Sequence, residues 1–355
     1  MPKRASFLFS ALATALCCVA TPVVLAQEIA ADTVEAWTPG DTAIRATAAG
    51  ISLPQTVASL SLTKSGEVSN GGRAVDNYAQ YLSEDGAVQA TLYVYLPTYA
   101  DASLAAYMTD KAIMTRFGTQ TRRTAYASTS AAGKANSAIR AVYDDAAEGA
   151  LTTAAGFVHA GRWIVKIRVT GPTARRGEVL AGLDGMLSKL SLDDTSILHT
   201  TAPASFGHCP TAQQGDARLN SVDPSRTATS LDTPMPREGK DALCVRGTVT
   251  TADGTYDMLQ QSGHSDGTMI VPIDDSGTIL AFDPASVGTG YQLSIHMVGQ
   301  TDLYGVYDRL PSAHQIAAIV DGKDPQTAQA EATVAYGANG RATMVRGKTS
   351  VAAAR

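Results

Sequence analysis

The feature that most constrains the fold is a period-two alternation of apolar and polar residues between positions 88 and 96. Apolar side chains occupy every even position, and Gln, Thr, Tyr and Tyr lie between them. The turn signature Glu84-Asp85-Gly86 precedes this run, and residues 78–82 lead into the turn. Alternating segments on both sides of a turn predict a β-hairpin.

The segments after the hairpin predict two helices separated by four strands. Asp101 is placed to cap a helix, and a second helix is predicted over about 174–190. The strands are predicted over 120–127, 137–144, 150–159 and 162–169. Short turns between neighbouring strands imply an antiparallel sheet with helices packed on it. We therefore expect an α+β fold, with an α-β-α sandwich-like domain over residues 51–195.

This order of elements resembles that of the PsbP/Mog1-like α-β-α sandwich group, which includes small exported bacterial proteins. The resemblance covers about residues 50–192 and rests on the order of the elements. It implies an accessory or partner-binding role for this part of the chain. It transfers no functional residue.

A change in composition divides the second half of the chain. Residues 196–240 are rich in Pro, Ser and Thr and poor in aliphatic side chains, which predicts a long linker. Strand-like runs return over 241–347, together with a short helix near 312–320, and Asn339-Gly340 indicates a two-residue hairpin. We expect a smaller β-rich domain over 241–347, followed by a polar tail over 348–355.

The first 26 residues have the pattern of a signal peptide. Lys3 and Arg4 give a positive start, and an apolar stretch follows from Phe7 to Ala20. Small residues before Gln27 predict cleavage near Ala26-Gln27, and residues 27–50 then form a flexible lead-in. We expect a periplasmic or secreted protein; a retained membrane anchor is the alternative. No second apolar run of about 18 residues predicts a transmembrane segment in the mature chain.

Two cysteines, Cys209 and Cys244, remain after the predicted cleavage. Paired thiols in an exported chain most often form a disulfide, and two buried free thiols are the alternative. Two thiols with only His208 nearby fall short of a four-coordinate zinc site, so we expect no metal. No motif indicates a cofactor.

Charge and composition exclude two broad classes of protein. The formal net charge is -5, which argues against a nucleic-acid partner because nucleic-acid binders usually carry a basic surface. Apolar residues make up 45% of the chain and charged residues 17%, which argues against a largely disordered chain.

One segment has the letters of a serine hydrolase motif. Residues 263–267 read Gly-His-Ser-Asp-Gly and match Gly-x-Ser-x-Gly, in which the nucleophile lies between a strand and a helix. The residues that follow predict another strand, so a polar turn is the favoured interpretation. The alternative is a hydrolase that uses Ser265, with His296 or His314 as its base.

Tyrosines are concentrated around the predicted hairpin, with six between residues 78 and 107. Tyr93 and Tyr95 point to the same side of their strand because side chains alternate between the two faces of a sheet. If a helix covers that side they belong to the core, which is the favoured interpretation. If the side is open they form a flat aromatic platform suited to a partner or a glycan.

Taken together, these patterns predict an exported protein of the cell envelope that binds a protein partner or a small ligand without catalysing a reaction. The alternatives are the hydrolase centred on Ser265 and a structural envelope protein that has no ligand.

Overall fold

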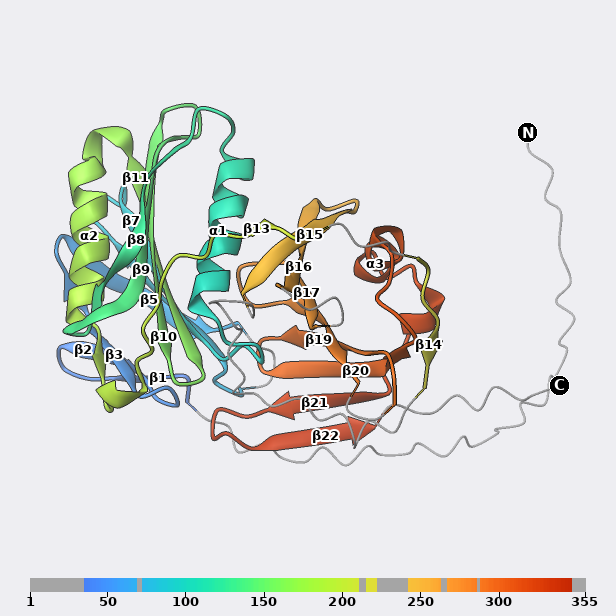
Figure 1. Ribbon diagram of the computed structural model, residues 1–355. Coiled ribbons are helices and arrows are strands. Elements are labelled where there is room, and N and C mark those ends of the chain that lie inside the picture. The colour runs from blue at the N-terminus through green and yellow to red at the C-terminus, as the bar shows by residue number, and fades with distance from the viewer. Residues whose placement is uncertain are drawn as a thin grey trace, which may run out of the picture. The chain divides into compact units, whose positions relative to one another are not determined.

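The structure is a computed structural model in which three β-sheets form most of the fold (Figure 1). It describes residues 35–68, 72–210, 215–221, 242–262, 267–285 and 288–346. The predicted signal peptide, the cleavage point near Ala26-Gln27, Ser265 and the tail over 348–355 lie outside these residues.

The prediction of an α+β, α-β-α sandwich-like fold is wrong, because the structure is mostly β. Strands account for 49% and helices for 16%, and the described residues contain three α-helices. The sequence reading missed the short strands before residue 68 and the strand at 300–307. Strands of two to four residues are too short for an alternation to stand out from the surrounding chain. The strands at 60–67 and 300–307 have eight residues each, but neither sequence keeps up an apolar–polar alternation.

The largest regular unit of the N-terminal half is an eight-stranded antiparallel sheet. In sheet order its strands are β4 (Thr56–Val57), β5 (Leu60–Glu67), β6 (Asp76–Leu82), β7 (Gln89–Tyr95), β11 (Trp163–Pro172), β10 (Leu151–Ala160), β9 (Lys134–Ala146) and β8 (Arg122–Ala131). The hairpin predicted from the alternation at 88–96 is confirmed as β6 and β7, and β7 pairs with β11 at the centre of the sheet.

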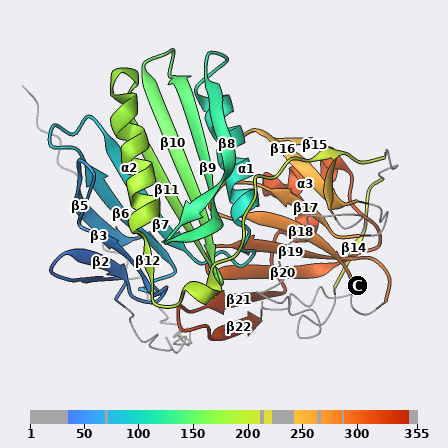
Figure 2. The same cartoon turned by 60° about the vertical axis from the view of Figure 1, so that its left-hand side comes forward.

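Two helices lie on opposite faces of this sheet, as both views show (Figure 1 and Figure 2). Helix α2 (Arg176–Lys189) buries Val179, Leu183 and Leu187 in the same core cluster as the β11 residues Val165 and Ile167. Helix α1 (Ala102–Arg116) packs on β9 and β10 and contributes alanines to a second cluster. The face of β6 and β7 that points away from α2 is therefore left for other contacts.

The start of α1 confirms the predicted cap. The side chain of Asp101 accepts hydrogen bonds from the backbone N–H groups of Ser103 and Leu104, at 2.8 Å and 3.1 Å. These bonds satisfy two donors that have no partner within the helix. The cap thus fixes the direction of α1 relative to β7, which precedes it.

A small four-stranded sheet contacts α2 through its strand β3. Its strands are β1 (Trp37–Pro39), β2 (Ala43–Ala46), β3 (Ile51–Pro54) and β12 (Ser191–Leu192). Part of the predicted flexible lead-in over 27–50 is therefore ordered as β1 and β2. The reason is burial, because Trp37 and Ile44 join the core cluster that also contains Leu53.

The C-terminal half forms a ten-stranded sheet and the third helix. Its elements are β13 (Gly207–His208), β14 (Leu219–Asn220), β15 (Leu243–Thr250), β16 (Thr255–Gln261), β17 (Met269–Pro272), β18 (Ile279–Pro284), β19 (Tyr291–Met297), β20 (Gln300–Tyr307), α3 (Ala313–Val320), β21 (Ala332–Tyr336) and β22 (Ala342–Arg346). The predicted helix near 312–320 and the hairpin at Asn339-Gly340 are confirmed by α3 and by the β21–β22 pair.

The predicted disulfide is present between Cys209 and Cys244. It joins the end of β13 to β15, and the backbone N–H of Cys209 donates to the carbonyl of Val245. The described parts of the predicted linker, 196–210 and 215–221, add β13 and β14 to the large sheet.

Residues Thr33–Arg355 form one unit by their internal contacts. Backbone bonds join the segment after β7 to the β19–β20 turn, with the N–H of Thr98 donating to the carbonyl of Met297 at 3.1 Å. None of the helices in the described ranges combines the length and the apolar character that a membrane span needs.

Candidate ligand-binding site

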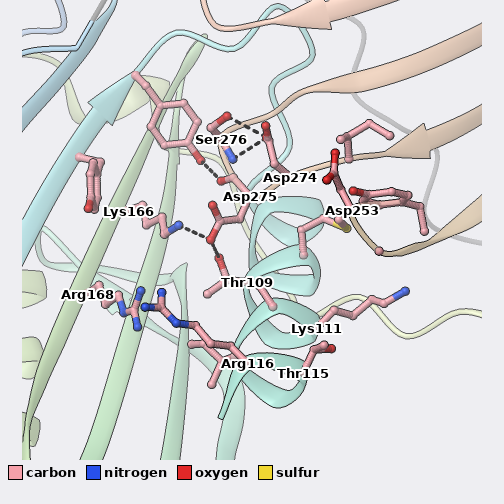
Figure 3. Close-up of a pocket in the computed structure, with 18 of the residues that line it drawn as sticks. Thr109, Lys111, Thr115, Arg116, Lys166, Arg168, Asp253, Asp274, Asp275 and Ser276 are labelled. Carbon is pink, nitrogen blue, oxygen red and sulfur yellow. Dashed lines mark hydrogen bonds and ion pairs between the residues drawn. The ribbon is translucent and has the colours of Figure 1, made fainter. Parts of the chain in front are cut away.

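A cavity of about 660 Å³ lies where α1, β7 and β11 meet the β15–β16 and β17–β18 turns (Figure 3). Ligand-binding clefts commonly have volumes of roughly 300–1,000 Å³. The cavity therefore has the size of a site for a small molecule.

The floor of the cavity comes from the sheet face opposite to α2. Strand register places Tyr93 of β7 beside Lys166 of β11, and Thr91 beside Arg168. Side chains that lie directly opposite in paired strands share one face. The alternation of the sequence therefore places both cations on the cavity side, while Ile167 between them points into the core with α2.

One wall of the cavity is a face of α1. Met108, Ala112 and Thr115 follow one another at spacings of four and three residues, and Thr109 and Arg116 lie beside them. Residues at these spacings share a side of a helix. The helix thus offers apolar surface in its middle turns and a guanidinium group at its last turn.

The β17–β18 turn forms the opposite wall and is fixed by its own hydrogen bonds. The Asp274 side chain accepts from the backbone N–H groups of Ser276 and Thr278, each at 2.9 Å, and from the Ser276 hydroxyl at 2.7 Å. This arrangement directs the next side chain, Asp275, toward β11 (Figure 3).

Asp275 links that turn to the sheet and to α1. Its Oδ2 lies 2.5 Å from Nζ of Lys166 and accepts a hydrogen bond from Oγ1 of Thr109 at 3.0 Å. The Tyr95 hydroxyl donates to its backbone carbonyl at 3.2 Å. Strand β11 and helix α1 therefore hold the carboxylate, and β7 holds the backbone of the same residue.

The environment of this ion pair shifts both pKa values. Burial alone would raise the pKa of Asp275, but the charge and hydrogen bond of Lys166, with the Thr109 bond and the charge of Arg168, lower it below its usual value. Burial lowers the pKa of Lys166, and the opposing effect of Asp275 is the smaller one. The Asp275 carboxylate is thus ionised at neutral pH and already accepts a hydrogen bond from the Lys166 ammonium.

Arg116, which is exposed and lies over the Phe117 ring at 5.6 Å, and the half-buried Arg168 differ from the other cations of the cavity in having no hydrogen bond or ion pair among the described residues. Within the same ranges, Nε of Arg168 is buried without an acceptor. By contrast, Lys111 pairs with Asp257 at 2.6 Å. The two arginine side chains extend toward one another from α1 and β11 (Figure 3).

A separate part of the lining is acidic. Burial raises the pKa of Asp76, and the negative charges of Glu67 and Asp274 raise it further. Asp76 lies opposite Tyr95 of β7, and Tyr95 lies opposite Ile164 of β11. Arg168 is four residues further along β11, so it is separated from the row of Asp76 by about 14 Å at the usual rise of a strand. The cavity therefore has a cationic end and an acidic end.

Tyr93 and Tyr95, for which the core was the favoured interpretation and a binding platform the alternative, both line this cavity. Tyr95 is buried, and its hydroxyl is engaged by the backbone of the β17–β18 turn. Tyr93 is half-buried, with the Lys166 ammonium 5.7 Å from its ring centre. Binding by these tyrosines remains a prediction.

The hydrolase candidates do not form a site among the described residues. Ser265 lies outside them. His296 is 3% exposed in β19, where Nδ1 lies 3.1 Å from the Thr98 hydroxyl and Nε2 lies 3.0 Å from the Ser294 hydroxyl. Both ring nitrogens are thus occupied by neighbouring hydroxyls. His314 is exposed on α3.

The charged residues of the cavity were missed by the sequence reading. The available signal was the presence of Lys166 and Arg168 two positions apart in a strand that is otherwise rich in Val and Ile. Such spacing places two cations on one face. Nothing in the sequence indicated that Arg116 faces them, because that depends on how α1 packs on the sheet.

A scan against protein-family models found no match for the chain, and a search of curated proteins found no significant similarity.

Proposed function

We propose that this chain is an exported, non-catalytic binding protein whose cavity takes a small organic anion. The observation that carries the proposal is that Arg116 and Arg168 line one cavity, extend toward one another, and have no hydrogen bond or ion pair within the part of the chain that the structure describes. Arginines outside the cavity on the same sheet behave differently. Arg122, Arg123 and Arg140 each pair with an aspartate.

The physical argument is the cost of two like charges in a partly enclosed space. Guanidinium groups that face one another repel, and the repulsion is stronger in a cavity than in bulk water because the effective dielectric constant is lower. A carboxylate or phosphate between them removes the repulsion and accepts paired hydrogen bonds from each planar fork. Apolar side chains such as Met108 and Ile273 suit the body of an organic ligand.

Export is part of the proposal, and two features support it. The first 26 residues have the pattern of a signal peptide. The Cys209–Cys244 disulfide is of a kind that persists in oxidising compartments. An envelope protein as the partner, in place of a small ligand, remains the main alternative.

The test is calorimetric titration of the purified protein with citrate, galacturonate and phosphate at constant ionic strength. Arg116→Gln and Arg168→Gln should each weaken binding by about tenfold or more, as expected when a charged hydrogen bond is lost. Arg140→Gln is the matched control, because that arginine pairs with Asp184 of α2 on the opposite face of the sheet.

A complementary measurement is native mass spectrometry of the protein isolated from its natural envelope fraction. A retained mass that disappears in the Arg168→Gln variant would support the proposal and show the size of the ligand. Equal affinities of Arg168→Gln and Arg140→Gln for the anions would refute it, as would a bare chain that binds none of the three.

A further inference from the structure

We infer that the half-exposed face of β6, β7 and β11 extends the cavity into a binding surface for an acidic oligosaccharide. The inference rests on the proposed function, because Arg168 belongs to both the cavity and this face. Tyr93 and Lys166 are likewise shared with the cavity. The inference adds a ligand class and four residues that do not line the cavity: Lys64, Tyr78, Gln80 and Thr91.

The face is built from two rows of side chains that strand pairing places in register. Tyr78 of β6 lies opposite Tyr93 of β7, and Tyr93 lies opposite Lys166 of β11. In the next row, Gln80 lies opposite Thr91, and Thr91 lies opposite Arg168. Rows two residues apart are separated by about 7 Å. Every member of the two rows except Lys166 is half-buried.

Tyr78 lies across the neighbouring strand. A Cβ added at Gly66 of β5 would come within 3.0 Å of the Tyr78 ring and hydroxyl, so the ring occupies the space above that glycine. The ring therefore covers the backbone of β5 with one side while the residue remains half-exposed. A tyrosine ring lying along a sheet is a suitable stacking surface for the apolar face of a sugar ring.

The cations of these two rows favour an anion, and the carboxylate of the same face, Asp76, lies in the row beyond Tyr78, away from Arg168. The Lys64 ammonium lies 5.5 Å from the Tyr78 ring centre, and Arg168 ends the second row next to the cavity. Neither row contains a carboxylate. Gln80 and Thr91 supply an amide and a hydroxyl between the tyrosines and the cations, as hydroxyl-rich ligands require.

An extended peptide fits this face less well than a glycan. Peptides usually add to the open edge of a sheet or fill apolar pockets. Strands β6, β7 and β11 are all internal, and each is paired on both sides. Their backbone groups are thus committed to the sheet, and recognition has to come from side chains. Rings, amides, hydroxyls and cations on a flat surface suit an oligosaccharide that carries carboxylates.

The test compares tetragalacturonate, galacturonate, neutral maltotetraose and polyglutamate in calorimetric titrations of the full chain. We expect tetragalacturonate to bind at least tenfold more tightly than galacturonate, and maltotetraose to bind weakly. Tyr78→Ala should weaken tetragalacturonate binding by about tenfold, or about 1.4 kcal/mol, and leave galacturonate unchanged. Tyr78→Phe retains the ring and should bind as the parent does, and circular dichroism verifies that both variants fold.

The possible results separate this inference from the proposed function. If tetragalacturonate gains nothing over galacturonate, or Tyr78→Ala has no effect, the extended face is not a glycan site, although the cavity can still bind anions. If polyglutamate shows the same affinity and the same dependence on Tyr78, the ligand is an acidic peptide and the inference is overturned. If Arg168→Gln leaves the affinity for both galacturonate and citrate unchanged, the proposed function itself fails.

Discussion

A buried histidine should make the stability of this protein depend on pH between about 6.5 and 4. His296 of β19 is 3% exposed, and burial lowers its pKa from 6.5 to about 4. The Thr98 hydroxyl donates to the carbonyl of Gln300, so it accepts from Nδ1–H of His296. Nε2 then accepts from the Ser294 hydroxyl. The hydrogen bonds of this site therefore match the neutral ring.

The magnitude follows from proton linkage. The folded pKa lies below the unfolded value, so the unfolded chain binds a proton between about pH 6.5 and 4 that the folded chain does not. Stability is fully present above about pH 6.5 and falls as the pH decreases. The loss reaches about 2 kcal/mol at about pH 5 and about 3 kcal/mol in total, from about 1.4 kcal/mol for each pKa unit.

The assay is urea unfolding followed by the fluorescence of Trp37 and Trp163 at several pH values between about 7.5 and 5. His296→Gln should be less stable than the parent near neutral pH, and the difference should shrink by about 2 kcal/mol at about pH 5. His314→Gln, at an exposed position of α3, should follow the parent at every pH. A His296→Gln variant with the same pH slope as the parent would show that this reasoning is wrong.

Three further predictions concern the stability of the fold. Replacing Cys209 and Cys244 by serine opens a loop of sequence separation 35 and should lower the urea unfolding free energy by about 4 kcal/mol. Asp101→Ala removes the cap of α1 and should cost about 1 kcal/mol in the same measurement. Gly290→Ala places a Cβ 2.1 Å from a carbonyl oxygen of β20. Gly288 also has a positive φ, but a Cβ there meets nothing within 4 Å. Gly290→Ala should therefore lower the thermal midpoint far more than Gly288→Ala. Equal midpoints for the two glycine variants would contradict this account.

Local patterns predicted the positions of many elements because those elements are long and periodic. The alternation at 88–96 and the helix cap at Asp101 involve residues close together in sequence, and the structure confirms both. The disulfide was predictable because Cys209 and Cys244 were the two thiols left after the predicted cleavage.

The mostly-β fold class could not be predicted from such local patterns. Strands such as β1 and β2 have three and four residues, and β12 has two, so none is long enough to show an alternation of its own. Strand β12 pairs with β3, more than a hundred residues earlier. Short strands gain their stability from pairing with other strands and from burial of residues such as Trp37. The periodicity of one sequence indicates neither the pairing nor the burial.

The charge pairing within the candidate site was also beyond prediction from local patterns. A strand pattern establishes which side chains share a face, so the cations of β11 were within reach of sequence reasoning. It does not establish which charges that face will meet. Asp275 comes from a turn 109 positions after Lys166 and forms an ion pair with it. Arg168, two residues further along the strand, has no hydrogen bond or ion pair with a carboxylate among the described residues. Whether a cation of this strand is paired with a carboxylate therefore depends on tertiary packing. For that reason the comparison between Arg168 and the paired Arg140 is the experiment that bears most directly on function.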